Sequence, residues 1–302
     1  MNPFLYKLEG VVIENKYHLR ELLGAGEFGV VYLTDEVVKD KLLRQVAVKI
    51  FDNNDNEQLI ELIEATRLDH PHLIRSHTAG EWQFNDKKKK TERLYLVMEQ
   101  AESSLQNRLE QGKLSRKEIV TTIREVAAGL NHLHRHHKVH CDLKPGNILW
   151  VNGHWKVSDF GLIRNLGNRS YARTVHIMGS YAYMSPESYK GEIRPAWDVW
   201  SLGILLQEML TGTHPFAATT IPQLTTKVLM QDPEFPEGLS DEFLTILKGC
   251  FAKNPKERWT AQQVLDAVQP RRETLPSIDQ LDLTSERPGI NYYKLRDLLA
   301  AK

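Results

Sequence analysis

Before residue 100, the hydrophobic and polar positions follow the pattern of β-strands. Residues 17–24, 29–38 and 44–51 are rich in Val, Leu, Ile and Tyr and are separated by turn-forming residues, which predicts three strands. Two further strands are expected around residues 79–84 and 93–98, joined by the segment NDKKKKT. The lysines of that segment are interpreted as a solvated hairpin tip.

Helical spacing interrupts these strands once and then dominates the chain. In residues 56–70 the apolar positions Leu59, Ile60 and Ile63 recur at helical intervals, and Pro71 ends the pattern. Further helices are predicted in segments 115–137, 195–212, 241–251 and 260–268. A strand-rich N-lobe followed by a helix-rich C-lobe predicts an α+β fold with a cleft between the lobes.

The two ends of the chain differ from this middle part. Residues 1–16 are interpreted as an N-terminal extension, and residues 17–268 as one domain with its N-lobe up to about residue 100. Residues 269–289 are polar, contain several prolines and lack periodicity, so they are predicted to be a linker. Residues 290–302 turn amphipathic again and are expected to be the truncated start of a further domain.

Composition argues against several classes of protein. The 302 residues carry 39 Lys plus Arg and 39 Asp plus Glu, without the basic excess expected of a nucleic-acid-binding protein. Two cysteines, Cys141 and Cys250, are too few for a disulfide framework and fit a reducing compartment. No apolar run approaches the roughly 18 residues that span a bilayer, and the N-terminus lacks a signal-peptide core. We expect a soluble, cytoplasmic protein with no membrane segment in this sequence.

A glycine-rich segment, GAGEFG at residues 24–29, lies between two predicted strands. A dinucleotide-binding turn would lead into a helix, whereas this segment leads into the strand-like GVVYL, which favours a hairpin. Gly24, Gly26 and Gly29 could let backbone amides approach phosphate groups. A plain glycine hairpin explains this motif equally well when it is taken alone.

Lys49 stands within the otherwise apolar strand VAVKI. Burying its charge is costly unless the ammonium group meets a counter-charge or a ligand phosphate. Val46, Val48 and Ile50 would share the opposite face of the strand, which argues against an exposed lysine at a strand end. The following helix offers three carboxylates as partners, namely Glu57, Glu61 and Glu64.

The densest cluster of reactive side chains is HCDLKPGN, from His140 to Asn147. Its His and Cys alone would suit a thiol nucleophile or a metal site, whereas its Asp, Lys and Asn suit a phosphate and its cation. The segment VSDFGL favours the second interpretation, because Asp159 and Asn147 offer the oxygen ligands that Mg²⁺ prefers. Asp142 could accept the proton of an attacking hydroxyl, and Lys144 could stabilise a moving phosphoryl group.

Taken in this order, the motifs resemble those of the eukaryotic-type protein kinase family from Tyr17 to Val268. The resemblance implies a bilobal kinase fold, ATP bound in the cleft with Mg²⁺ or Mn²⁺, and a protein substrate. It assigns the ATP site to the glycine-rich loop, the adenine-contacting residues, the gatekeeper Met98 and the hinge. The implied residues are Gly24, Ala25, Gly26, Gly29, Val31, Ala47, Lys49, Met98, Glu99, Ala101 and Leu149.

The resemblance also implies which residues hold the phosphates and the cation. Lys49 would contact the α- and β-phosphates and pair with Glu61, which the family's spacing to the motif HPHL favours over Glu64. Asn147 and Asp159 would be the metal ligands.

Asp142 would be the catalytic base, and two neighbouring features indicate the class of hydroxyl that it serves. Lys144 follows Asp142 by two residues, and Ser180 lies in GSYAYMSPE; both features are typical of Ser/Thr kinases. Arg258 would pair with Glu187 of the SPE motif.

The chain departs from the family at Cys141, where most members carry an Arg that binds the phosphorylated activation segment. The motif therefore reads His-Cys-Asp (HCD) instead of His-Arg-Asp (HRD), which defines a non-RD kinase. For this type we hypothesise that activity does not strictly need phosphorylation of residues 162–184. Arg164, Arg169 and Arg173 could receive a phosphate there, or the segment could be a solvated basic loop. Cys141 itself is interpreted as a small buried residue in preference to an oxidation-sensitive thiol.

Two further segments invite sharper interpretations. The histidines of HLHRHHKVH, residues 132–140, lack a carboxylate or Cys to complete a metal site, so a structural role is favoured. The final segment INYYKLRDLLAAK resembles the first helix of the genomes-uncoupled-four type porphyrin-binding domain, although a generic amphipathic helix would read the same. The resemblance implies a bacterial protein with a tetrapyrrole-sensing domain.

Two rival functions remain. A pseudokinase would signal by shape alone, but the catalytic positions Lys49, Asp142, Asn147 and Asp159 are all filled. A small-molecule phosphotransferase would share the fold, but the SPE motif and the DVWSLG helix favour a protein substrate.

Overall fold

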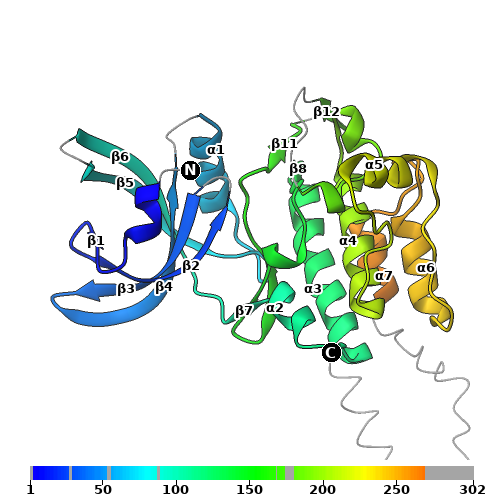
Figure 1. Ribbon diagram of the computed structural model, residues 1–302, viewed down its shortest axis with the longest axis horizontal. Helices are drawn as coiled ribbons and strands as arrows, with labels where there is room; N and C mark the ends of the chain where they lie inside the picture. The colour runs from blue at the N-terminus through cyan, green and yellow to red at the C-terminus, as the bar shows by residue number, and fades with distance from the viewer. Residues whose placement is uncertain are drawn as a thin grey trace, which may run out of the picture. The chain divides into compact units, whose positions relative to one another are not determined.

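The computed structural model describes residues 3–26, 29–52, 56–86, 89–167, 169–173 and 180–268. An antiparallel sheet forms the N-lobe and a group of helices forms the C-lobe (Figure 1). The α+β, bilobal architecture predicted from the sequence is therefore confirmed. The predicted linker at 269–289 and the porphyrin-domain resemblance at 290–302 lie outside the described residues.

The N-lobe sheet has six strands in the order β1-β2-β3-β4-β6-β5. They are β1 (Val12–Ile13), β2 (Tyr17–Gly26), β3 (Gly29–Val38), β4 (Lys41–Phe51), β5 (Ser76–Asp86) and β6 (Lys89–Met98). Several strands extend beyond the predicted apolar stretches, because the hairpins continue to pair up to their tips, at Val38–Lys41 and Asp86–Lys89.

Helix α1 (Asn56–Arg67) packs on β5 and β6. It ends at Arg67, before the predicted boundary at residue 70. On the sheet, Val46, Val48 and Ile50 are fully buried on one face, as the alternation predicts. Lys49 is therefore directed to the other face.

The N-terminal extension is part of the N-lobe core. A 3₁₀ helix, η1 (Pro3–Lys7), places Leu5 and Leu8 against the sheet with both side chains fully buried. The hydroxyl of Tyr32 donates to the Leu5 carbonyl at 2.7 Å and accepts from the Leu8 N–H at 3.2 Å. So few apolar residues give no periodic signal, which explains why the sequence did not predict this packing.

The C-lobe is built around α3 (Arg116–Arg135), which packs against α4 (Pro195–Thr211) and α7 (Ala261–Val268). Three more helices complete it: α2 (Leu105–Glu110), α5 (Ile221–Met230) and α6 (Asp241–Cys250). Ser115 starts α3 with a capping box, in which Ser115 and Glu118 satisfy each other's backbone N–H groups. The short helices α2 and α5 were not predicted.

Short strands carry the segments that line the cleft. β7 (Ser103–Ser104), β9 (Ile148–Val151) and β10 (His154–Val157) form one sheet. The pairs β8 (Lys138–Val139) with β11 (Arg164–Asn165), and β12 (Ala172–Arg173) with β13 (Glu192–Ile193), form two others. The 3₁₀ turns are η2 (Pro145–Asn147), η3 (Tyr181–Tyr183) and η4 (Ser188–Lys190).

A buried ion pair joins the end of the SPE motif to the loop before α7. The Arg258 guanidinium donates to both carboxylate oxygens of Glu187, at 2.6 and 2.9 Å, and also to the carbonyls of Ala196 and Ala252. Arg258 is 5% exposed and Glu187 is 4% exposed. The pair that the family resemblance implied is therefore present, and water does not screen it.

We predict that Glu187→Gln lowers the free energy of unfolding by about 3–5 kcal/mol, because it leaves the Arg258 charge buried without a counter-charge. Urea unfolding of the variant and the parent measures the difference. Arg20→Ala is the matched control, since it breaks a pair with Asp35 in which Arg20 is 62% exposed. That exposed pair contributes no more than about 1 kcal/mol, so equal losses in the two variants would contradict the prediction.

Candidate active site

A cavity of about 510 Å³ lies between the N-lobe sheet and the C-lobe. All eleven residues predicted for the ATP site line it, together with Lys144, Asn147 and Asp159. The cavity has further lining residues that the sequence did not single out: Leu23, Ile74, Leu96, Glu102, Ser103, Ser104, Asn107, Gly146, Ser158 and Phe160. Most of these are ordinary apolar or polar residues beside a motif, so only their three-dimensional position reveals them.

The apolar part of the cavity draws on both lobes. Val31 and Ala47 come from the N-lobe strands β3 and β4, whereas Leu149 comes from β9 of the C-lobe. Met98 pairs with Ala47 across the β4–β6 ladder, at the point where β6 ends and the chain crosses to the C-lobe. A flat apolar ring would fit between these side chains.

The hinge after β6 presents unused backbone groups. Among the described residues, the Glu99 carbonyl and the Ala101 N–H have no hydrogen-bond partner. The Glu99 carboxylate, in contrast, is fixed by Lys156 Nζ at 2.7 and 2.8 Å and by the Arg75 N–H at 2.8 Å. The two free backbone groups can therefore serve a ligand in the cavity.

Of the three glycines in the loop motif, the packing of the strands requires only Gly29. Gly29 has a φ of +148°, and a Cβ there would lie 2.1 Å from the Ile50 carbonyl oxygen, so the β3–β4 packing requires glycine. A Cβ at Gly24 or Gly26 would meet no atom within 4 Å. Their small size leaves room on the side of the backbone that lines the cavity.

Lys49 and Asp159 meet inside the cavity. Lys49 Nζ donates to Asp159 Oδ1 at 3.0 Å, and Lys49 is 8% exposed. Burial raises the pKa of Asp159, but the charge and the hydrogen bond of Lys49, together with the charge of Lys144, outweigh burial and hold the pKa below its usual value. The carboxylate is therefore ionised and ready to accept a cation.

The structure leaves the predicted helix partner of Lys49 open. Glu61 belongs to α1, but its side chain lies outside the described part of the chain. Glu64, the less favoured alternative, forms an ion pair with Lys138.

Asp142 is the centre of a dense hydrogen-bond network. Its Oδ2 accepts from Lys144 Nζ at 2.7 Å and from Asn147 Nδ2 at 3.1 Å, and its Oδ1 accepts from the Ser180 N–H at 2.8 Å. Asn147 Nδ2 also donates to the Asp142 carbonyl at 2.8 Å, and Lys144 Nζ donates to Ser180 Oγ at 3.1 Å. Because the Asn147 amide hydrogens face Asp142, the Oδ1 atom of Asn147 remains available to a cation.

The loop that carries Asp142 is held from below by α4. Asp198, which is fully buried, accepts from the backbone N–H groups of His140 and Cys141, each at 2.9 Å. Its Oδ2 also lies 2.7 Å from His134 Nε2. Since Cys141 adopts a left-handed conformation with φ +68°, these hydrogen bonds offset the cost of a strained backbone at the site.

His140 connects this loop to the strand that leads to Asp159. Its Nδ1 accepts from the Asp142 N–H at 3.2 Å, so its Nε2 carries the proton and donates to the Ser158 carbonyl at 2.9 Å. The imidazole is fully buried and both nitrogens are occupied. His140 is therefore a positioning residue, as the sequence interpretation favoured.

Cys141 is 1% exposed and belongs to an apolar cluster with Leu162, Leu166, Met184 and Trp197. Burial raises the pKa of its thiol well above the usual value. The interpretation as a small buried residue agrees with this environment, whereas a reactive thiol does not.

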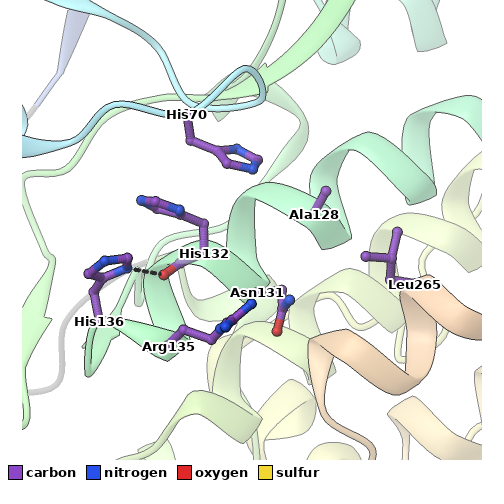
Figure 2. A pocket seen from close by; sticks show the side chains of 7 residues that line it. All are labelled: His70, Ala128, Asn131, His132, Arg135, His136 and Leu265. Carbon is purple, nitrogen blue, oxygen red and sulfur yellow. Dashed lines mark hydrogen bonds between the residues drawn. The ribbon is translucent and has the colours of Figure 1, made fainter.

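The histidine-rich run contributes to a second cavity, of about 410 Å³, which shares no lining residue with the first (Figure 2). His132 lies between His70 and His136, with ring centroids 4.7 and 4.4 Å apart, and His136 Nδ1 lies 2.8 Å from the His132 carbonyl oxygen. Burial and the neighbouring imidazoles lower the pKa of His70 to about 4. Within the described ranges, none of the run's histidines belongs to a group of three that could share a metal ion.

Comparison with known proteins decides the family. Residues 17–268 match the protein kinase domain. The chain belongs to the protein kinase family. This kinase has, within the described residues, no helix that is long and apolar enough to cross a membrane.

Relatives of this kinase come from distant organisms. It is 31% identical over 279 residues to serine/threonine-protein kinase PrkC of Bacillus subtilis. That alignment covers 86% of this chain and 41% of PrkC. It is 30% identical over 262 residues to PknA of Mycobacterium tuberculosis, covering 83% of this chain and 59% of PknA. For serine/threonine-protein kinase 36 of Pongo abelii the identity is 32% over 253 residues, with shares of 80% and 18%. The chain thus spans less than two thirds of each of these relatives.

We predict that neither cysteine of the folded protein reacts with a soluble thiol reagent. Cys141 and Cys250 are both buried, and burial raises the pKa of Cys250 to about 12, so almost no thiolate is accessible. Counting released chromophore against time measures the reaction, and the same protein in concentrated urea, where both thiols should react, is the control. Rapid modification of Cys141 under native conditions would contradict the prediction.

Proposed function

We propose that this chain is a Ser/Thr protein kinase, which transfers the γ-phosphoryl group of ATP to Ser or Thr hydroxyls of a protein substrate. The observation that carries the proposal is that Lys144, Asn147 and Asp159 line one side of the cavity, while its other side is an apolar slot with a free hinge. Asp142 lies directly behind that side, hydrogen-bonded to Lys144 and Asn147. A nucleotide fits this division, because its base is apolar and flat and its phosphates are anionic.

The proposed mechanism divides the chemistry among these side chains. Asp142 accepts the proton of the substrate hydroxyl, whose oxygen forms a bond to the γ-phosphorus while the bond to the β–γ bridging oxygen breaks. Lys144, 2.7 Å from Asp142, offsets the negative charge that develops on the transferring group. Lys49 holds the nucleotide phosphates in line for the attack.

Asn147 and Asp159 would hold the divalent cation, for which we propose Mg²⁺, with Mn²⁺ as a substitute. The donor set supports this choice, since an amide oxygen and an ionised carboxylate are the ligands that hard cations prefer. When bound, the cation neutralises phosphate charge that develops during transfer.

The Ser/Thr preference rests on Lys144 and Ser180. The Lys144 ammonium group bridges the Asp142 carboxylate and the Ser180 hydroxyl, at 2.7 and 3.1 Å. Ser180 thus lies where the acceptor hydroxyl would approach. The relatives PrkC and PknA are named as Ser/Thr kinases, which supports the same class.

We also propose that activity does not strictly need phosphorylation of residues 162–184, since HCD replaces HRD. Cys141 offers no cation to a phosphate, and its apolar neighbours Leu162, Leu166 and Met184 belong to the same segment. Apolar contacts that need no phosphate therefore hold both ends of the segment. Phosphatase-treated protein, and a Ser170→Ala, Thr174→Ala variant, should keep most of the activity; loss of activity in both would contradict the proposal.

The setting of the enzyme is a further part of the proposal. Free, buried cysteines and a balanced charge support a cytoplasmic location, and the resemblance to PrkC and PknA supports a bacterial origin. The motif at 290–302 supports a tetrapyrrole-sensing domain beyond the linker.

We predict that Asp142→Asn lowers the rate of phosphoryl transfer by about 10²–10⁴-fold, because the variant removes the general base. Transfer from γ-labelled ATP in the presence of Mg²⁺, followed by phosphoamino-acid analysis, measures both the rate and the residue type. Phosphoserine and phosphothreonine are the expected products. Binding of ATP should change little in the variant, since Asp142 does not line the cavity.

Arg20→Ala, at an exposed residue that does not line the cavity, is the control for general effects of mutation. Wild-type protein that binds ATP without transferring phosphate would indicate a pseudokinase. Transfer to small alcohols or amines but not to proteins would indicate a small-molecule phosphotransferase.

A further inference from the structure

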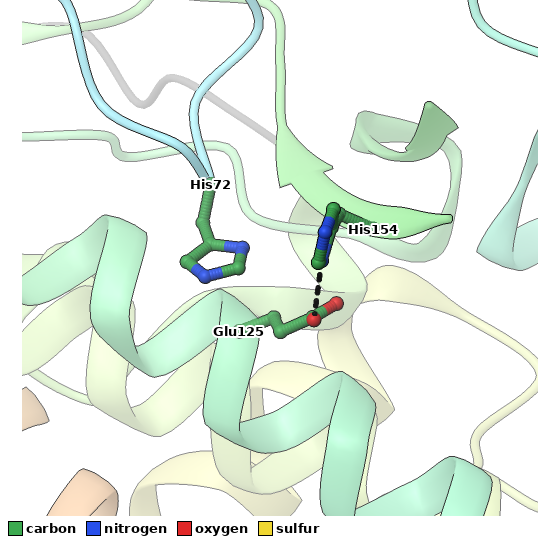
Figure 3. Close-up of side chains that lie close together, drawn as sticks. All are labelled: His72, Glu125 and His154. Atoms are coloured by element: carbon green, nitrogen blue, oxygen red, sulfur yellow. Dashed lines mark hydrogen bonds and ion pairs between the residues drawn. The ribbon is translucent and has the colours of Figure 1, made fainter. Parts of the chain in front are cut away.

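A second group of potential ligands lies outside the ATP cavity. His72, Glu125 and His154 each place a ligand atom within 4.8 Å of the other two. Figure 3 shows that they come from three separate segments: the loop between α1 and β5, the helix α3, and the start of β10. Within the described part of the chain, this is the one group of three His, Cys, Asp or Glu side chains with such spacing.

The backbone of Trp155 orients two of the three side chains. The Trp155 N–H donates to Glu125 Oε2 at 2.7 Å, and the Trp155 carbonyl lies 3.2 Å from His72 Nδ1. A carbonyl only accepts, so His72 carries its proton on Nδ1, and its Nε2 has a free lone pair. Such outer contacts fix the tautomer and direction of metal-binding imidazoles and carboxylates in known sites.

The third side chain can complete the group. His154 Nδ1 lies 2.9 Å from Glu125 Oε1, the oxygen that Trp155 does not use. A zinc-bound imidazole nitrogen lies about 2.0–2.1 Å from the ion, so two rings in a tetrahedral site have centres roughly 5 Å apart. The centres of His72 and His154 are 5.8 Å apart and the rings cross at 72°. Because the His154 side chain is 59% exposed, its ring is free to rotate and so to close the difference between these two ring distances.

The charges around the group favour a cation over an empty cluster. Glu125 is 5% exposed, and a buried carboxylate needs a strong counter-charge. A divalent ion held between the Glu125 carboxylate and the two imidazoles would supply that counter-charge.

We propose that His72, Glu125 and His154 bind one divalent transition-metal ion of the zinc class, with solvent at the fourth position. Two imidazole nitrogens and one carboxylate oxygen suit Zn²⁺, Ni²⁺, Co²⁺ and Cu²⁺, whereas Mg²⁺ and Ca²⁺ prefer sites made only of oxygen. The exposure of His154 gives the ion a path from solvent.

The position of the site gives the ion a structural consequence. The His72 carbonyl accepts from the Val157 N–H at 2.9 Å, and the Ile74 N–H donates to the Val157 carbonyl at 2.8 Å. A Cβ on Gly129 of α3 would lie 2.6 Å from the His72 carbonyl oxygen, so the loop rests directly on the helix. A bound ion would therefore clamp the α1–β5 loop to the C-lobe. The loop is hydrogen-bonded to Val157, the last residue of β10, which lies two residues before Asp159.

The proposal is tested without any activity measurement, by treating the full chain with a chelator and then measuring how it binds added metal ions. We expect one equivalent of Zn²⁺ to bind in calorimetry in the presence of excess Mg²⁺, and to raise the melting temperature. Co²⁺ should give the visible absorption of a tetrahedral site. His154→Ala and Glu125→Gln should each weaken Zn²⁺ binding at least tenfold and abolish that absorption.

Two matched variants separate this site from its competitors. His132→Ala alters the histidine cavity of Figure 2, and Asp159→Asn alters the proposed cation site of the ATP cavity; both should leave Zn²⁺ affinity unchanged. Absence of Zn²⁺ binding in the parent, or binding that persists in His154→Ala, would overturn the proposal. These outcomes are independent of phosphoryl transfer, so a kinase without this metal site and a metal site in an inactive protein are distinguishable.

Discussion

The buried carboxylate of Asp198 is the interaction on which the geometry of the active site depends. A carboxylate side chain without solvent contact needs several donors, and here two successive backbone N–H groups and His134 supply them. The two backbone donors belong to His140 and Cys141, so the carboxylate fixes the conformation of the residues directly before Asp142. A strained φ at Cys141 is maintained because relaxing it would leave Asp198 without its donors.

Successive hydrogen bonds connect the loop held by Asp198 to the other functional side chains. His140 joins the loop to Ser158, whose N–H and hydroxyl both donate to the Asn147 carbonyl, at 2.9 and 3.0 Å. Ser158 precedes Asp159, which meets Lys49 of the N-lobe. The proposed base, the proposed metal ligands and the lysine proposed to hold the phosphates therefore belong to one connected network that starts at α4 and reaches the sheet. Such a network restricts these side chains to one arrangement.

The sequence predicts most of this fold because its main elements have strong local signals. Alternation in β3 and helical spacing in α3 are of this kind, and the ordered motifs identify the residues that line the ATP cavity. Local signals fail where a structure depends on distant contacts. The packing of Leu5 and Leu8 on Tyr32 needs the finished sheet, and the group of His72, Glu125 and His154 is brought together only by folding. The histidine-rich run drew attention by its composition, yet all three grouped ligands lie outside it.

The replacement of Arg by Cys at position 141 changes the kind of force that can act on the activation segment. An Arg at this place would attract a phosphate, so its effect would depend on modification and on ionic strength. Cys141 instead belongs to an apolar cluster with Leu162, Leu166, Met184, Ile193 and Trp197, and these contacts form without a phosphate on the segment. The left-handed backbone at Cys141 directs its small side chain into that cluster while its N–H remains bound to Asp198. Cys141 thus has two roles: its backbone helps to position Asp142, and its side chain helps to hold the segment that carries Ser180.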